Sequence, residues 1–328
     1  MFVVCVRHYE KWWRHDEAWS GTTIRIVMRS WQISALLKTK LHIPPVRPEL
    51  VPRPRLIERL NAGLHRKLTL ISAPAGFGKT TLLSEWIHTR SREYGVASKE
   101  HTSERPPTPY SLLPTHSFAW LSLDETDNDF THFATHLIAA LQRVKPGLGE
   151  TILAVFQSPQ LPPVEAVMAS LINEIAEIPE RLALVLDDYH VIQSSTNQAV
   201  GFLLERLPPQ LHLVIVTRRD PLLPLARLRA RGQTTEIRGS DLQFTGGEAA
   251  HFLNQAMGLA LTPREIALLE SRTEGWIAGL QLAALALQGR SPLQNRAEFI
   301  LTFSGDDRYV IDFLVSEVLS GQPERGKR

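Results

Sequence analysis

The residues with the clearest chemical potential lie where an apolar strand meets an apolar helix. Residues 68–72 are rich in strand formers, residues 73–78 form a loop with two glycines, and Lys79-Thr80-Thr81 opens the helix. In this context main-chain N–H groups point inward around the β- and γ-phosphates, and the helix N-terminus adds its positive dipole end. Lys79 would reach the same phosphates, and the Thr80 hydroxyl would ligate Mg²⁺. The segment predicts a P-loop that binds a nucleoside triphosphate.

One position of this loop departs from the usual G-x-x-x-x-G-K-[ST] pattern. Ala73 stands where the first glycine belongs, and a residue with a Cβ can serve there only if its φ angle is negative. The residues expected to contact the nucleotide are Ala73, Pro74, Ala75, Gly76, Phe77, Gly78, Lys79, Thr80 and Thr81.

Two further predicted strands end in groups that would complete such a site. The apolar run 182–186 is followed by Asp187 and Asp188. We expect Asp187 to hold Mg²⁺ through water and Asp188 to orient or deprotonate an attacking water. The strand 211–216 leads through Thr217 to Arg218. An arginine at this tip lies beside the P-loop in a parallel sheet, so Arg218 is the expected sensor of the γ-phosphate.

Several other polar and aromatic residues have two interpretations. His190 either contacts phosphate or water or is structural, and Arg219 is either solvated or paired with Asp220. For three further sets the structural interpretation is favoured over a functional one. Arginines 227, 229 and 231 are expected to be solvated charges rather than a nucleic-acid stripe. Trp120 and Trp276 are expected in the core rather than stacked on adenine. Asp124, Asp127 and Asp129 are expected to form a capping turn rather than a ligand set.

Composition limits the remaining possibilities. The 328 residues are 43% hydrophobic and 21% charged, which is typical of a soluble globular protein of roughly two domains. The formal net charge of +2 does not by itself imply a nucleic-acid surface. Cys5 is the single cysteine, which excludes an intrachain disulfide and a cysteine-based zinc site. No apolar run approaches the ~18 residues that span a bilayer, so the cytoplasm is the expected compartment.

Strands and helices alternate in the first two thirds of the chain. This order predicts an α/β fold: a P-loop NTPase core of three α/β/α layers around a parallel sheet, followed by a small all-α lid. Strands are expected at 68–72, 118–123, 182–186 and 211–217, and helices at 55–65, from 79, at 130–144, 164–177 and 200–207. Later helices are expected at 246–257, 263–272 and 276–287, the first two opened by capping boxes at Thr245 and Thr262.

The chain divides into four predicted parts. The first part, residues 1–36, holds four of the seven tryptophans without periodicity. It is either an extension that is disordered or wrongly included in the gene, or an arm that binds a partner or a membrane surface. The parts are an N-terminal extension at 1–36, an NTPase core at 37–243 with a proline-rich surface insertion at 91–117, a helical lid at 244–290, and a linker with the incomplete start of a winged helix at 291–328.

Six ordered motifs resemble the ATPase module of the large ATP-binding LuxR-type (MalT-like) transcriptional regulators, which belong to the STAND class of signal-transducing P-loop ATPases. Ala73 is usual in that family. The motifs are residues 36–41 with Val51-Pro52-Arg53, then 72–82, 120–128, 186–190, 217–232 and 274–283.

The resemblance implies a bacterial ATP-binding switch with slow or weak hydrolysis. ADP would hold a closed state, and ATP with an inducer would permit self-association. Arg53 would lie near the nucleotide, and Gly275-Trp276 would help to close the lid over it. The chain ends before the sensor and DNA-binding domains of such regulators, so no direct DNA binding by this chain is expected. The alternatives are an ordinary P-loop ATPase that couples hydrolysis to nucleic-acid work or phosphoryl transfer, and a functionless remnant.

Overall fold

The computed structural model describes residues 37–97, 116–158, 160–288, 299–301 and 303. The expected N-terminal extension, most of the proline-rich insertion and most of the winged-helix start lie outside these residues. Within the described helices, no span is long and apolar enough to cross a membrane.

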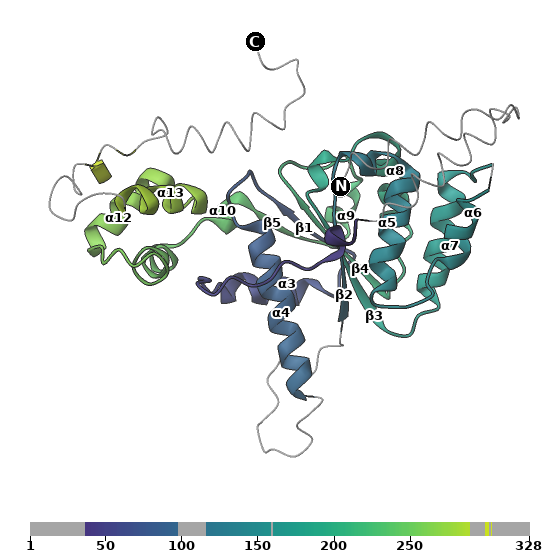
Figure 1. Cartoon of the computed structure of the whole chain (residues 1–328), viewed down its shortest axis with the longest axis horizontal. Coiled ribbons are helices and arrows are strands. Elements are labelled where there is room, and N and C mark those ends of the chain that lie inside the picture. Colours follow the sequence, from purple (N-terminus) through teal and green to yellow (C-terminus); the bar gives the residue numbers. More distant parts are fainter. Residues whose placement is uncertain (1–36, 98–115, 159, 289–298, 302, 304–328) are drawn as a thin grey trace, which may run out of the picture.

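The core is one parallel sheet whose strands follow the order β2-β3-β4-β1-β5. The strands are β1 (Leu68–Ser72), β2 (His116–Ser122), β3 (Arg181–Asp187), β4 (Leu211–Thr217) and β5 (Thr234–Arg238). β1 is flanked by β4 and β5, so the loop that follows it opens at the carboxyl edge between these two strands (Figure 1). The predicted three-layer P-loop NTPase fold is confirmed.

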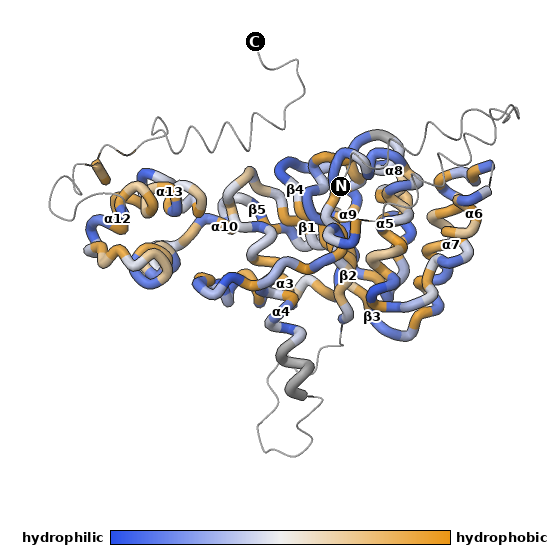
Figure 2. The backbone as a smooth tube through the Cα atoms, viewed as in Figure 1, coloured by the Kyte–Doolittle hydropathy of each residue, from blue (hydrophilic) through white to orange (hydrophobic). Residues whose placement is uncertain are grey.

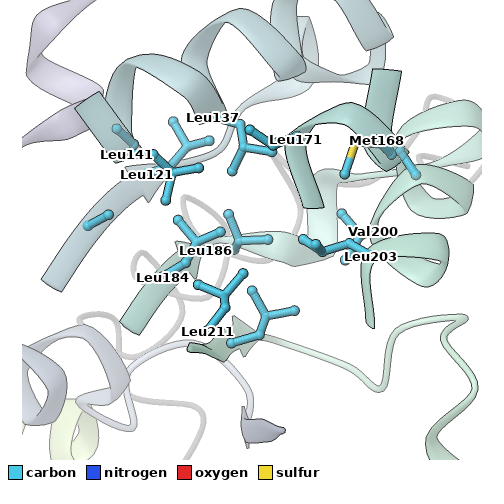
Figure 3. Close-up of a cluster of buried hydrophobic side chains, with 14 of the residues drawn as sticks. Leu121, Leu137, Leu141, Met168, Leu171, Leu184, Leu186, Val200, Leu203 and Leu211 are labelled. Carbon is cyan, nitrogen blue, oxygen red and sulfur yellow. The ribbon is translucent and has the colours of Figure 1, made fainter. Parts of the chain in front are cut away.

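Side chains alternate between two apolar layers, as the period of a strand requires. Leu184 and Leu186 belong to one buried cluster, whereas Val185 belongs to the cluster on the opposite face. Figure 3 shows residues of β2 and β3 meeting residues of three helices in the first layer. That layer contains α5 (Phe130–Gln142), α7 (Val164–Ala176), α8 (Ser194–Glu205) and α9 (Leu225–Ala230), and the second layer contains α3 (Pro54–Gly63) and α4 (Lys79–Ala97).

Several elements differ from the expectations. Helix α4 continues to Ala97 and β2 begins at His116, so the expected insertion at 91–117 is too long at both ends. The polar residues of its first part continue the helix because no proline interrupts them. Strand β5 was not predicted, and neither was the short helix α6 (Glu150–Val155), which packs beside α7.

A helical lid follows β5 and the short helix α10 (Gly239–Leu242). Thr245 and Thr262 each accept a hydrogen bond from the main chain three residues on, so both predicted capping boxes are confirmed. The lid has its own apolar core, which includes Phe299 and Ile300, and Figure 2 shows hydrophobic residues along its helices. Its elements are α11 (Gly246–Ala250), a π-helical turn (His251–Ala256), α12 (Pro263–Thr273) and α13 (Ile277–Gln288).

Candidate nucleotide site

The P-loop takes its shape from two glycines and its anchor from strand β4. Gly76 and Gly78 have φ angles of +78° and +70°, in the left-handed region that favours glycine. Ala73 is absent from the described residues with positive φ, as its Cβ requires. Its N–H donates to the carbonyl of Thr217 at 3.2 Å, so the loop starts in register with β4.

Lys79 and Thr80 open α4 directly below this loop. The Lys79 side chain is 8% exposed, and its Nζ donates to the carbonyl of Pro74 at 2.8 Å. Burial and the nearby charge of Arg218 together lower the pKa of Lys79 to about 8, against the opposing effect of Asp188 and Asp187. An anionic phosphate would offset both the burial of the Lys79 ammonium group and its repulsion by Arg218. The geometry therefore places this cation where a phosphate would stabilise its charged form.

Asp187 is the last residue of β3 and turns its carboxylate toward α4. Its Oδ2 accepts from the Thr80 hydroxyl at 3.0 Å, and its Oδ1 accepts from the Asp188 N–H at 2.9 Å. Burial, with the charge of Asp188, raises its pKa to about 6. A hydroxyl and a carboxylate in contact are the two protein oxygens with which P-loop proteins hold Mg²⁺, whose other ligands are water and phosphate. The residues present therefore fit Mg²⁺.

Asp188, His190 and Arg218 lie around the same edge. Asp188 adopts a left-handed conformation with φ +56°, and its Oδ1 lies 3.7 Å from His190 Nδ1. Burial, together with the charge of Arg218, lowers the pKa of His190 to about 4. Arg218 is half-buried after β4, whereas Arg219 is exposed. Arg218 acts electrostatically on both Lys79 and His190. The structure therefore brings together six residues considered from the sequence: Lys79, Thr80, Asp187, Asp188, His190 and Arg218.

The lid contacts the P-loop main chain directly, beside the Gly275-Trp276 segment that the resemblance placed over the nucleotide. The Trp276 Nε1–H donates to the Ala75 carbonyl at 3.0 Å, and the Ala278 N–H donates to the Gly76 carbonyl at 3.0 Å. A Cβ added to Gly76 would lie 2.5 Å from the Ala278 Cβ. Trp276 is thus part lid core and part P-loop contact, whereas Trp120 is 1% exposed and purely core, as expected.

Arg53 lies at the joint between the NTPase core and the lid. Its Nη2 donates to the carbonyls of Leu242 and Gln243 at 2.9 and 3.1 Å, and its Nε pairs with Glu248 at 3.4 Å. Among the described residues its hydrogen-bond and ion-pair partners are outside the P-loop. Its Nη1, however, is buried with no hydrogen-bond partner in that part of the chain. The expected contact of Arg53 with a nucleotide therefore stays a proposal, and that nitrogen is the one available for it.

The acidic turn after β2 is structural, as favoured from the sequence. Asp124 and Asp129 accept main-chain hydrogen bonds at the starts of a 3₁₀ turn (Glu125–Asn128) and of α5. Asp127 is fully buried, where it accepts from Lys40 Nζ at 2.8 Å and from His136 Nδ1 at 2.7 Å. In the described residues no cluster of three or more His, Cys, Asp or Glu could hold a metal.

An ion-pair network beside β4 and β5 was also missed. Asp220 pairs with Arg238 and with Arg229, at 3.2 Å for the latter, and Arg229 also pairs with Glu236 at 2.5 Å. Hydrogen bonding to Arg238 lowers the pKa of Asp220 to about 2. Asp220 therefore pairs with these two arginines, and Arg229 is more than a solvated charge. The spacing of these residues in sequence gave no signal, because the unpredicted strand β5 supplies two of them.

The chain matches one family model and is similar in sequence to two known proteins. Residues 49–216 match the family model described as an AAA ATPase domain. The chain is 36% identical over 271 residues to the serine/threonine-protein kinase PknK of Mycobacterium tuberculosis, covering 82% of this chain and 22% of that protein. It is 32% identical over 286 residues to the HTH-type transcriptional regulator MalT of Yersinia pestis, covering 87% of this chain and 29% of that protein.

One solved structure has the same fold at low sequence identity. It is a signal transduction ATPase with numerous domains (STAND) from Pyrococcus horikoshii, with a tetratricopeptide repeat sensor. The TM-score is 0.51 at 18% identity, covering 78% of this chain and 32% of that one. The chain spans less than a third of the length of each of these three proteins.

Proposed function

Because this chain belongs to the AAA ATPase domain family, we propose that it is the ATP-binding switch module of a STAND-type signal-transduction ATPase. The observation that carries the proposal is the double hydrogen bond between the lid and the P-loop carbonyls of Ala75 and Gly76. A nucleotide that reorients the P-loop main chain changes these bonds, so the lid position depends on what the loop holds.

Each site residue has a role in this proposal. The main-chain N–H groups of residues 73–78 and the start of α4 hold the phosphates. Lys79 exchanges the Pro74 carbonyl for phosphate oxygens, since its ammonium group is attracted more strongly to an anionic oxygen than to a neutral carbonyl. Thr80 and Asp187 hold Mg²⁺, which supplies charge neutralisation to the phosphates when it is bound.

Hydrolysis is proposed to be slow and to reset the switch. Asp188 is the residue that orients or deprotonates the attacking water, and Arg218 stabilises the charge that develops on the γ-phosphate. ADP then holds the lid closed, and ATP permits self-association. A slow reaction suits a switch because the ATP state must last long enough to be read by a partner.

The relatives support a shared module with different outputs. One is called a protein kinase and the other a transcriptional regulator, yet both match this chain over more than four fifths of its length. The nucleotide module is therefore the common part. We extend the proposal to a role in transcription regulation for the protein that carries this module, because the motifs at 120–128, 186–190 and 217–232 resemble those of LuxR-type regulators.

Binding, turnover and lid protection together test the proposal. Purified chain should bind ATP and ADP with Mg²⁺, and Lys79→Ala should weaken binding about 10–100-fold, the loss of a charge-assisted bond. Turnover should stay below the ~1–100 s⁻¹ of a working phosphoryl-transfer enzyme. Hydrogen exchange in residues 276–288 should differ between the ATP and ADP states. Turnover in the enzyme range, or identical exchange in the two states, would overturn the switch in favour of an ordinary ATPase.

A further inference from the structure

A basic hollow lies at the edge of the sheet opposite the P-loop. Its volume is about 310 Å³, and Lys67, Arg206, Arg227 and Arg231 line it together with one acid, Glu205. Lys67 precedes β1, whereas the P-loop follows β1, so the length of this strand separates the two sites. At ~3.3 Å per residue a five-residue strand spans about 16 Å, so one small ligand cannot occupy both.

The cations of this hollow are only partly compensated by the protein. Lys67 Nζ donates to the Glu205 carbonyl at 3.3 Å, and Arg206 Nη1 lies 3.4 Å from the Glu205 carboxylate. In the described part of the chain, the side chains of Arg227 and Arg231 have no hydrogen-bond or ion-pair partner. The ends of α8 and α9 each add about half a negative charge, which leaves a net positive hollow.

The arginines of helix α9 and its C-cap residue Arg231 lie in two different environments. Arg229 points to the ion-pair network of Asp220 and Glu236. Arg227 and Arg231, four residues apart, share the face that lines the hollow, and like charges at this spacing repel each other. A bound anion would offset that repulsion, whereas the pair of like charges stabilises nothing if only water surrounds it.

We propose that this hollow binds a small molecule that carries two or more linked phosphates. Arginine forks match phosphate oxygens in pairs, and the volume is that of a small-ligand site. The remaining lining is the polar side chain of Gln233 and the aliphatic side chains of Leu204, Leu228 and Pro224. Single-stranded nucleic acid binds along extended grooves with aromatic stacking partners, and this compact hollow has no aromatic lining residue. The site is independent of the proposed switch function.

Inorganic pyrophosphate is the probe, titrated calorimetrically into the full chain. Lys79→Ala is present throughout to weaken anion binding at the P-loop. In this background pyrophosphate should bind saturably at about 0.15 M ionic strength, and Arg227→Gln with Arg231→Gln should weaken it at least about tenfold. The matched control is Arg264→Gln with Arg272→Gln, which removes two exposed charges from the lid helix α12 and should change the affinity less than about twofold.

Three outcomes would overturn the proposal. The first is the absence of saturable pyrophosphate binding, and the second is equal weakening by the two double variants. The third is that a poly-glutamate peptide or a single-stranded oligonucleotide binds at the hollow more tightly than pyrophosphate does. Thermal melting of each variant shows whether it is folded. Lys67→Gln gives a second, independent substitution on the opposite wall of the hollow and should also weaken pyrophosphate binding.

Discussion

The indole Nε1–H of Trp276 donates a hydrogen bond to the main-chain carbonyl of Ala75 at 3.0 Å. These residues lie in separate parts of the fold, since Ala75 lies in the P-loop and Trp276 immediately precedes the lid helix α13. The contact fixes the lid against the loop that should hold the phosphates. It makes the lid position testable through single side chains.

Trp276→Phe should loosen the docked lid without removing its apolar contact. The ring still packs on the lid core, but a neutral hydrogen bond worth about 0.5–1.5 kcal/mol is lost. Hydrogen exchange in residues 277–288 should accelerate about 2- to 12-fold. Trp120→Phe is the control, because it removes an indole N–H that bonds to Ser122 within the core. Equal exchange changes in the two variants would mean that the Trp276 bond does not hold the lid.

Gly76→Ala should affect the lid more than backbone strain alone explains. Gly76 has φ +78°, and its added Cβ would lie 2.5 Å from the Ala278 Cβ. Gly232→Ala is the matched control, since that residue has φ +63° with no atom within 4 Å of the added Cβ. Each variant should lose about 1–2 kcal/mol of unfolding free energy to strain. Only Gly76→Ala should also release the lid in hydrogen exchange and weaken ATP binding.

If both alanine variants behave alike, the close approach of Gly76 to the lid has no consequence. A second measurement on the same variants controls for a general loss of stability. Denaturant titration gives the free energy of unfolding of each variant, so exchange is compared between proteins of known stability.

The local motifs were predictable from the sequence because each is contained in a short run of residues. The P-loop needs its strand, its glycines and the start of its helix within 14 positions, and the acid after β3 follows an apolar run directly. Strand β5 was missed because Thr234–Arg238 contains one strongly apolar residue, Ile237, and alternation cannot be recognised from a single position.

The resemblance placed Gly275-Trp276 over the nucleotide, but the atoms that join the lid to the P-loop were not predictable from the residues, for a different reason. Gly76 and Ala278 meet through main-chain atoms, which carry no sequence signature, and 201 residues separate Ala75 from Trp276. Arg53 shows the same limit, because its position beside the carbonyls of residues 242 and 243 depends on where α3 packs. Residue types predict what a side chain can bind, but the fold decides which partner it reaches.

Thr80→Val should remove the dependence of nucleotide affinity on Mg²⁺ while keeping the shape of the side chain. The Thr80 hydroxyl is 3.0 Å from Asp187 Oδ2, and both oxygens are candidate ligands of the ion or its water. ATP affinity measured with and without Mg²⁺ should differ about tenfold or more in the parent and hardly at all in the variant. Thr80→Ser retains the hydroxyl and should keep the effect. A valine variant with full Mg²⁺ dependence would exclude Thr80 as a ligand.

Buried His212 should make the stability of the core depend on pH. Its Nδ1 lies 2.7 Å from the Arg66 carbonyl, which only accepts, so Nδ1 carries the proton. Nε2 therefore accepts from the Thr69 hydroxyl at 3.0 Å. Burial lowers the pKa of His212 from 6.5 to about 4, because a charged imidazole would lie between β1 and β4 without water.

The sign of this effect follows from which state binds the proton. Between pH 4 and 6.5 the unfolded chain protonates this histidine and the folded chain does not, so the free energy of unfolding rises with pH. The contribution, about 3 kcal/mol, is complete above pH 6.5 and is lost as the pH falls toward 4. His212→Asn keeps a donor for the Arg66 carbonyl but cannot titrate, so its stability profile should be flatter by this amount. His42→Asn removes an exposed histidine and should leave the parent profile unchanged; parallel profiles for the parent and His212→Asn would show that His212 is protonated in the folded protein as readily as in the unfolded chain.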